Sequence, residues 1–69
     1  MFEIGDFVRI NDRTHDERMP ASRMGHIVER VHATVHYAEK GKTPTSVYKV
    51  FMTNGVTLKF HEMYFERVL

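Results

Sequence analysis

The stretch VYKVFMTNGVTLKFH, residues 47–61, predicts a β-hairpin that turns at Thr53-Asn54-Gly55. A two-residue Asn-Gly turn would mix apolar and charged side chains on both faces of this hairpin. A three-residue loop with Gly55 in the left-handed conformation gives one apolar face instead. Because a one-residue slip moves every side chain to the opposite face, burial selects this second register. It pairs Met52 with Val56, Val50 with Leu58 and Tyr48 with Phe60, and it leaves Lys49, Phe51, Thr57 and Lys59 on the other face.

Short segments on both sides of the hairpin predict further strands. Residues 7–10 read as a first strand with Val8 and Ile10 pointing inward. Residues 11–24 have no period and form a long polar loop that contains Pro20. Residues 38–46 form a second loop, with Gly41 and Pro44. Residues 62–65 are too few for an α-helix and predict one 3₁₀ turn, after which residues 66–69 form a closing strand that pairs with the first.

The second strand is predicted over residues 25–37, where apolar residues alternate with polar ones. Glu29 is the one residue that breaks the inward series. A bulge near residues 29–31 would explain this mismatch by bending the strand. Alternatively, the strand ends near His32 and an ordered loop edge follows.

The order of these elements predicts an all-β fold. We expect a small five-stranded SH3-like barrel with a long first loop, a tight distal hairpin and a 3₁₀ turn before the last strand, as a single domain over residues 1–69. A five-stranded OB-type barrel is the alternative. That fold normally has a helix between its third and fourth strands, and the sequence offers none.

The composition excludes several classes of protein. The sequence contains no cysteine, so disulfides, thiolate metal sites and a cysteine nucleophile are excluded, and we expect a cytoplasmic protein. It has neither a signal-peptide pattern nor a run of about 18 apolar residues, so we expect no membrane contact. The formal net charge of +1 is too small to argue for nucleic-acid binding by itself.

The five histidines are the obvious candidates for a metal site. His26, His32 and His36 share one face if the second strand is continuous. At about 3.3 Å per residue, however, His32 and His36 stand roughly 13 Å apart, and only a bulge or a cross-strand partner such as His61 could bring them to one ion. The sequence also lacks a nucleophile elbow and a glycine-rich phosphate loop. We therefore predict no metal, no cofactor, no catalytic residue and no enzymatic activity.

The long first loop is the predicted site of contact with a protein partner. Its arginines stand beside acidic residues, and loops of mixed charge often meet proteins, whereas a surface that follows phosphates would carry fewer acids. Its two methionines are not needed by the inward faces, and methionine adapts well to protein partners. The predicted contact residues are Arg13, Arg18, Met19, Arg23 and Met24.

Nucleic-acid binding is the alternative function. Lys49 and Lys59 are adjacent in the chosen register, and Phe51 lies near them. Basic residues interleaved with an aromatic ring suit single-stranded nucleic acid. The residues of this alternative site are Arg9, Arg30, Lys49, Lys59 and Phe51. We expect a monomer or a weak homodimer, the latter through pairing of edge strands.

Two family resemblances fit this fold. The segments GDFVRI (residues 5–10) and GHIVER (residues 25–30) resemble the Gly-Asp-x-Val-x-Ile and Gly-x-Ile pattern of KOW and related SH3-like barrels. Those modules occur in transcription factors and ribosomal proteins and bind RNA, ribosomes or RNA polymerase. The resemblance implies an SH3-like fold and a role in transcription or translation.

The second resemblance begins at Arg18. Arg18-Met19-Pro20, followed by MGHIVERVHATVHYAEKGKTPTSVYKVFM (residues 24–52), is similar to the C-terminal SH3-like domain of nitrile hydratase β subunits. That family carries an Arg-x-Pro, a Gly-x-Ile/Val strand and a Tyr-x-Val-x-Phe strand. The resemblance implies that Arg18 reaches the oxidised cysteines of a metal-bearing α subunit. The chain would then be an accessory subunit.

Overall fold

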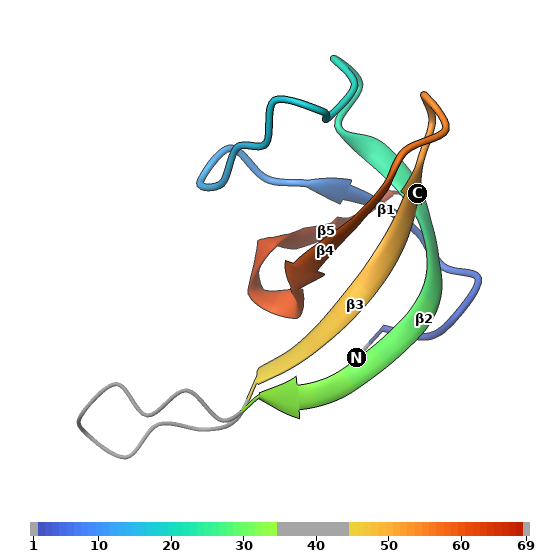
Figure 1. The fold of residues 1–69 in the computed structure, drawn as a ribbon, viewed down its shortest axis with the longest axis vertical. Helices are drawn as coiled ribbons and strands as arrows, with labels where there is room; N and C mark the ends of the chain where they lie inside the picture. Colours follow the sequence, from blue (N-terminus) through green and yellow to red (C-terminus); the bar gives the residue numbers. More distant parts are fainter. Residues whose placement is uncertain (1, 35–44, 69) are drawn as a thin grey trace.

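Five antiparallel strands in one curved sheet make up almost all of the regular structure (Figure 1). The computed structural model describes residues 2–34 and 45–68. The strands are β1 (Phe7–Ile10), β2 (Met24–Thr34), β3 (Thr45–Met52), β4 (Thr57–His61) and β5 (Phe65–Arg67), and one 3₁₀ turn, η1 (Glu62–Tyr64), precedes β5. Their order in the sheet is β4-β3-β2-β1-β5. The prediction of an all-β fold is confirmed.

The predicted first strand and 3₁₀ turn are confirmed, and the other boundaries move slightly. The closing strand begins at Phe65, one residue earlier than expected, because the Phe65 side chain is buried opposite Ile10. It pairs with β1, as predicted. The predicted loop over residues 38–46 lies outside the described residues except for its last two residues, which belong to β3.

The hairpin has the predicted register. Val50 pairs with Leu58 and Tyr48 pairs with Phe60. The Met52 N–H donates to the Val56 carbonyl over 2.8 Å. Gly55 has a φ of 90° and donates to the Met52 carbonyl, so a residue that tolerates positive φ closes the three-residue loop.

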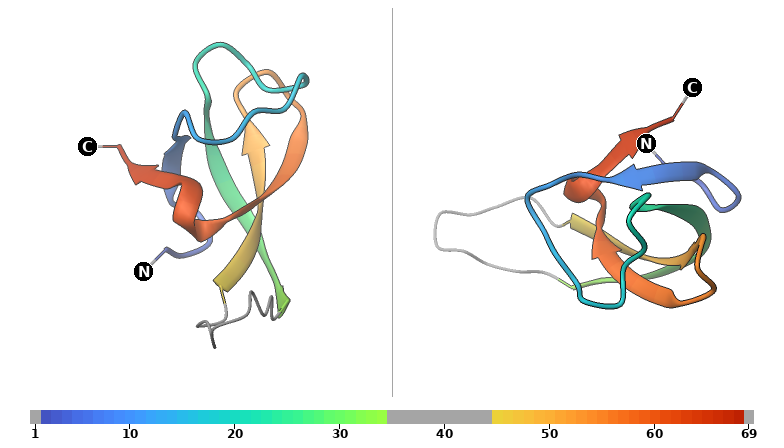
Figure 2. Two further views of the ribbon diagram at one scale, coloured as in Figure 1. Left: turned by 90° about the vertical axis from the view of Figure 1, so that its left-hand side faces the viewer. Right: turned by 90° about the horizontal axis from the view of Figure 1, so that it is seen from above.

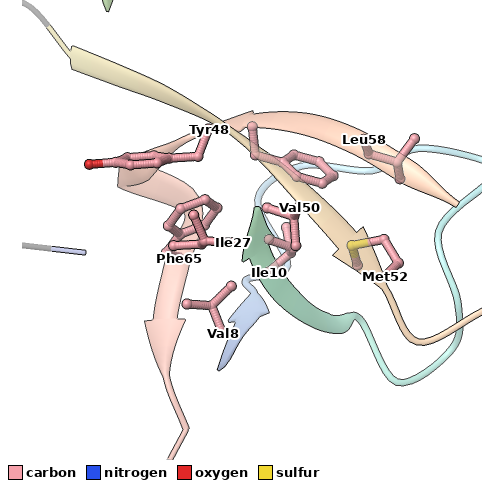
Figure 3. Close-up of a cluster of buried hydrophobic side chains, with 9 residues drawn as sticks. Val8, Ile10, Ile27, Tyr48, Val50, Met52, Leu58 and Phe65 are labelled. Atoms are coloured by element: carbon pink, nitrogen blue, oxygen red, sulfur yellow. The ribbon is translucent and has the colours of Figure 1, made fainter. Parts of the chain in front are cut away.

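The hairpin supplies more than half of the core. Figure 3 shows buried side chains from β1, β2, β3, β4 and β5 converging on the concave side of the sheet. The buried residues are Val8, Ile10, Ile27, Tyr48, Val50, Met52, Leu58, Phe60 and Phe65. Tyr48 also contacts the Phe65 ring, with 5.6 Å between ring centroids. The inward-facing residues predicted for the hairpin and for β1 are therefore confirmed.

A bulge in β2 explains the misplaced Glu29. The pairing of β2 with β3 shifts between Ile27 and Glu29, so the extra residue is Val28, which lies just before the predicted range 29–31. Ile27 is buried, whereas Glu29 is exposed opposite Lys49. The bulge thus turns Glu29 to the outside, where its charge is solvated. A second shift lies between Val31 and Thr34, where β2 ends.

The distal turn of the hairpin lies at the same end of the molecule as part of the first loop. In Figure 2 (left), the end of loop 11–23 that leads into β2 and turn 53–55 stand beside each other. This loop begins next to η1, where the Asn11 N–H donates to the Tyr64 carbonyl over 2.8 Å. Loop 11–23 thus extends across the surface from η1 to the distal turn.

Candidate functional site

The half-buried side chain of Arg23 holds loop 11–23, which joins β1 to β2, in its conformation. The guanidinium of Arg23 donates hydrogen bonds to the backbone carbonyls of Ile10, Asn11 and Thr14. Only 17% of its side-chain surface is exposed. The Arg23 backbone has a φ of 59°, which is uncommon for a residue other than glycine. Arg23 therefore positions the loop, and few of its donors remain for a partner.

The second half of the loop is tied to the distal turn. The Asn54 side-chain amide donates to the Arg18 carbonyl over 3.0 Å. The hydroxyl groups of Ser22 and Thr53 lie 2.8 Å apart, and the Thr53 N–H donates to the Met24 carbonyl over 3.0 Å. Side chains and backbone thus fix the loop against the hairpin that supports it.

Arg18 stands at the exposed part of this anchored loop. Its Nε and one terminal nitrogen donate to the two oxygens of Asp16 over 3.0 and 2.9 Å. The Asp16 carboxylate also accepts the Arg18 backbone N–H. Chiefly through the side-chain hydrogen bonds, Arg18 lowers the pKa of Asp16 from 3.8 to about 2. Even so, 65% of the Arg18 side chain is exposed.

Arg13 lies at the other end of the loop and contacts η1. It donates to the Met63 carbonyl over 3.2 Å, and its guanidinium carbon is 5.9 Å from the centre of the Tyr64 ring. Met63 is 49% exposed. This part of the surface combines a cation, an aromatic ring and an exposed apolar side chain. Tyr64 and Met63 were not among the predicted site residues, because a 3₁₀ turn gives no sign in the sequence of which loop it contacts.

The two methionines of the predicted site have different positions. Met19 is half-buried and packs against the hydrophobic core, so the expectation that the inward faces do not need it is wrong. The loop passes over the core and closes it with this side chain. Met24 is half-buried at the start of β2, opposite Arg9. The five predicted contact residues therefore extend from η1 to the distal turn and do not form one cluster.

A row of three rings crosses the outer face, which we define as the side of the sheet opposite the core. Phe7 pairs with His26, and His26 pairs with Phe51, so the three rings lie side by side on β1, β2 and β3. The Phe7 and His26 ring centroids are 4.8 Å apart. All three residues are exposed, Phe7 at 36% and Phe51 at 48%. We call these three residues the aromatic row.

Two lysines lie next to this row. Lys49 pairs with Lys59 across β3 and β4, as the predicted register requires. Lys49 forms an ion pair with Glu29 over 3.3 Å. No ion pair involves Lys59 within residues 2–34 and 45–68. Lys49 is two residues along β3 from Phe51, which is about 7 Å, and Lys59 lies one strand further out, on β4.

The two arginines of the alternative site, Arg9 and Arg30, lie on opposite faces of the sheet. Arg9 is on the outer face, two residues from Phe7, where it forms ion pairs with Glu66 over 3.1 Å and Asp12 over 3.4 Å. Arg30 lies opposite Tyr48, whose side chain is buried, so it points to the other side of the sheet and donates to the Ser46 hydroxyl. The bulge at Val28 causes this reversal, which simple alternation does not predict.

Among the described residues, no group of three or more potential metal-ligating side chains could hold an ion. His36 lies outside these residues, so the predicted spacing of the histidines on β2 is not tested. Within the same part of the chain, no helix has the length and apolar character needed to cross a membrane.

Comparison of this chain with protein-family models, curated proteins and solved structures finds no match.

Proposed function

We propose that this chain is a non-enzymatic SH3-like module that binds a protein partner through residues 11–24, which comprise loop 11–23 and Met24, the first residue of β2. The strand order, the long first loop and the 3₁₀ turn before the last strand support an SH3-like assignment. Closure of the curved sheet into a barrel is part of the proposal. In this fold a rigid scaffold supports a long loop, an arrangement in which loops commonly carry the binding residues.

The exposed Arg18 on an anchored loop is the observation that carries the proposal. A guanidinium has five N–H donors, and the hydrogen bonds to Asp16 use two of them. The remaining donors can bind a carboxylate or a carbonyl of a partner. Because the loop is already fixed to the distal turn, binding loses less conformational entropy than it would with a free loop. Arginine is also among the residues that dominate binding energy at interfaces.

The surroundings of Arg18 suit a protein partner better than a polyanion. Acidic groups stand beside the loop arginines, including Asp16 next to Arg18 and Asp12 near Arg23. A polar rim of both signs is typical of protein interfaces. At the η1 end, Arg13 and the exposed Met63 add a second contact region.

The similarity to nitrile hydratase β subunits suggests which kind of protein the partner is. It assigns Arg18 to the oxidised cysteines of a metal-bearing subunit, and an exposed guanidinium with free donors suits such a contact. A metalloenzyme subunit would then be the protein partner, and the chain would have no active site of its own.

Affinity capture tests the proposal. The immobilised chain is incubated with extract of its host, and captured proteins are quantified by mass spectrometry. We expect at least one specific protein to be retained by the original chain and lost with Arg18→Ala. A partner set that Arg18→Ala retains in full, or the absence of any specific capture, would contradict the proposal.

Lys59→Ala is the matched control for this experiment. It removes the same charge from an exposed position on β4, away from residues 11–24. It should keep the partner that Arg18→Ala loses. Arg18→Lys separates charge from geometry, because lysine keeps the charge but cannot form the planar two-donor contact. We expect Arg18→Lys to bind the partner weakly.

A further inference from the structure

We infer that the outer face of the sheet is a second binding surface, and that it takes single-stranded nucleic acid on the aromatic row. This surface adjoins loop 11–23, since Arg9 lies opposite Met24, but it uses none of the residues assigned to the protein partner. The inference starts from Phe7, His26 and Phe51, three exposed rings placed side by side by strand pairing. Folding leaves 36% of Phe7 and 48% of Phe51 exposed, and three exposed rings grouped in one row are typical of a binding surface.

The rings of the aromatic row can serve as stacking surfaces for unstacked bases. Neighbouring strands lie about 4.8 Å apart, and the Phe7 and His26 centroids are 4.8 Å apart. A base stacks on the face of an aromatic ring whatever its sequence, and such stacking holds single strands on sheet surfaces. Bases in a duplex are stacked on each other and cannot use these rings. The row therefore favours single strands over duplexes.

The charges near the row are placed for phosphates. Lys49, about 7 Å from Phe51 along β3, and its cross-strand partner Lys59 lie on one side of the row, and Arg9 lies on the other side. Among the described residues, Lys59 has no ion-pair partner. The pair of Lys49 with Glu29 is exposed on both sides, at 37% and 57%, and an exposed pair of this kind is weak enough for a phosphate to replace.

Arg9 contributes less than the lysines. Its guanidinium contacts Glu66 and Asp12, which already neutralise it. We therefore assign two phosphates to this face, one on Lys49 and one on Lys59. The electrostatic part of binding is then small, and stacking on the aromatic row supplies the rest. This balance agrees with the low net charge of the chain.

A direct titration tests the inference. A fluorescein-labelled oligothymidine of about eight nucleotides is titrated with the protein, and anisotropy is followed between about 50 and 200 mM salt. Oligouridine of the same length and a matched duplex form two further arms. We expect both single strands to bind more tightly than the duplex. The logarithm of the affinity should fall with the logarithm of salt with a slope of about −1.4, the value for two phosphates on a single strand.

Variants of the face assign the binding. Phe51→Leu keeps an apolar side chain without a ring and should weaken binding about tenfold, whereas Phe51→Tyr keeps the ring and should bind as the original chain does. Lys59→Ala should reduce the slope by about 0.7. Arg18→Ala, on the loop, should change neither quantity. Thermal melting of each variant verifies that it is folded.

Four results would overturn the inference. They are no binding at the lowest salt, equal or tighter binding of the duplex, full retention of binding by Phe51→Leu, and loss of binding in Arg18→Ala alone. Capture of a protein that Phe51→Leu loses, with no oligonucleotide bound, would also overturn it, because the face would then be a protein-binding surface. The proposed loop contact is judged by Arg18→Ala in the capture experiment, so either proposal can fail without the other.

Discussion

Replacing Gly25 with alanine should strongly destabilise the fold, because β2 and β3 approach each other too closely at this point for a side chain. A Cβ atom on Gly25 would lie 2.5 Å from the Phe51 carbonyl oxygen, 2.8 Å from the Met52 Cα and 2.8 Å from a methyl carbon of Val50. Ordinary van der Waals contact begins at 3.4 Å. The backbone φ of Gly25 is not positive, so the effect of alanine is steric.

The size of the effect follows from these distances. The contacts are too short by about 0.9 Å and about 0.6 Å, and two of the three atoms belong to the backbone of β3. That strand must therefore move away from β2, which lengthens the hydrogen bonds of the ladder. Overpacking of a core costs about 1–3 kcal/mol, and we expect the upper end of this range, about 3 kcal/mol. A chain of this length has a total stability of only about 3–10 kcal/mol.

Urea unfolding followed by circular dichroism measures the loss. At about 3 kcal/mol, the melting temperature should also fall by roughly 12–24 °C. Thr57→Ala is the control, because it places alanine at an exposed position of β4 and should cost at most about 1 kcal/mol. If Gly25→Ala unfolds at the same urea concentration as Thr57→Ala, the close approach of the two strands is refuted. Because Phe51 and His26 lie beside this contact, Gly25→Ala should also disturb the aromatic row.

Three further predictions concern the turn and the loop. Gly55→Val should cost about 2 kcal/mol, because a β-branched residue resists the φ of 90°, whereas Gly55→Asn should cost about half as much in the same urea experiment. Arg23→Ala leaves three backbone carbonyls without their donor and should cost about 1–3 kcal/mol; amide hydrogen exchange over residues 12–22 should then become faster. Because its pKa is depressed, Asp16 contributes stability above pH 3.8 that is lost as the pH falls towards 2. Arg18→Ala should return this pKa towards 3.8, which an NMR titration of the carboxyl carbon measures.

The hairpin was predictable because two independent constraints in its sequence agree. Gly55 permits the positive φ that a three-residue loop requires, and only the register that follows from this loop buries Val50 and Leu58 together. The first strand was predictable for a similar reason, since Val8 and Ile10 are the two buried residues in it. Strong alternation with one buried face leaves little choice of register.

The bulge in β2 was predicted near residues 29–31, and its exact place, at Val28, could not be predicted because alternation does not determine it. Ile27 is buried and Glu29 is exposed, but alternation alone does not show whether an extra residue separates them or whether Glu29 is a polar mismatch on the inner face. Pairing with β3 fixes the position of the bulge, because Glu29 gains an ion pair when it lies opposite Lys49. Such a contact joins residues that are far apart in the sequence.

The inner arginine of the loop could not be recognised from the sequence. Arg23 stands directly before β2, two residues ahead of Gly25. Nothing in the neighbouring sequence distinguishes it from the exposed Arg18. Its role depends on where the carbonyls of Ile10 and Thr14 lie once the loop has folded. Positive φ at an arginine is also not expected from its residue type. Loop arginines therefore have to be sorted by their acceptors, which only the folded chain provides.

Strand formation alone does not explain the aromatic row. Threonine or valine would satisfy the strand preference at Phe7 and Phe51 with less exposed apolar surface. The rings add little to the core, since about half of Phe51 remains exposed. Phe51→Thr should therefore leave the free energy of unfolding within about 1 kcal/mol of the original value. A loss of oligonucleotide binding without a loss of stability would show that the ring serves binding, whereas a loss of stability of several kcal/mol would show that the ring serves the fold.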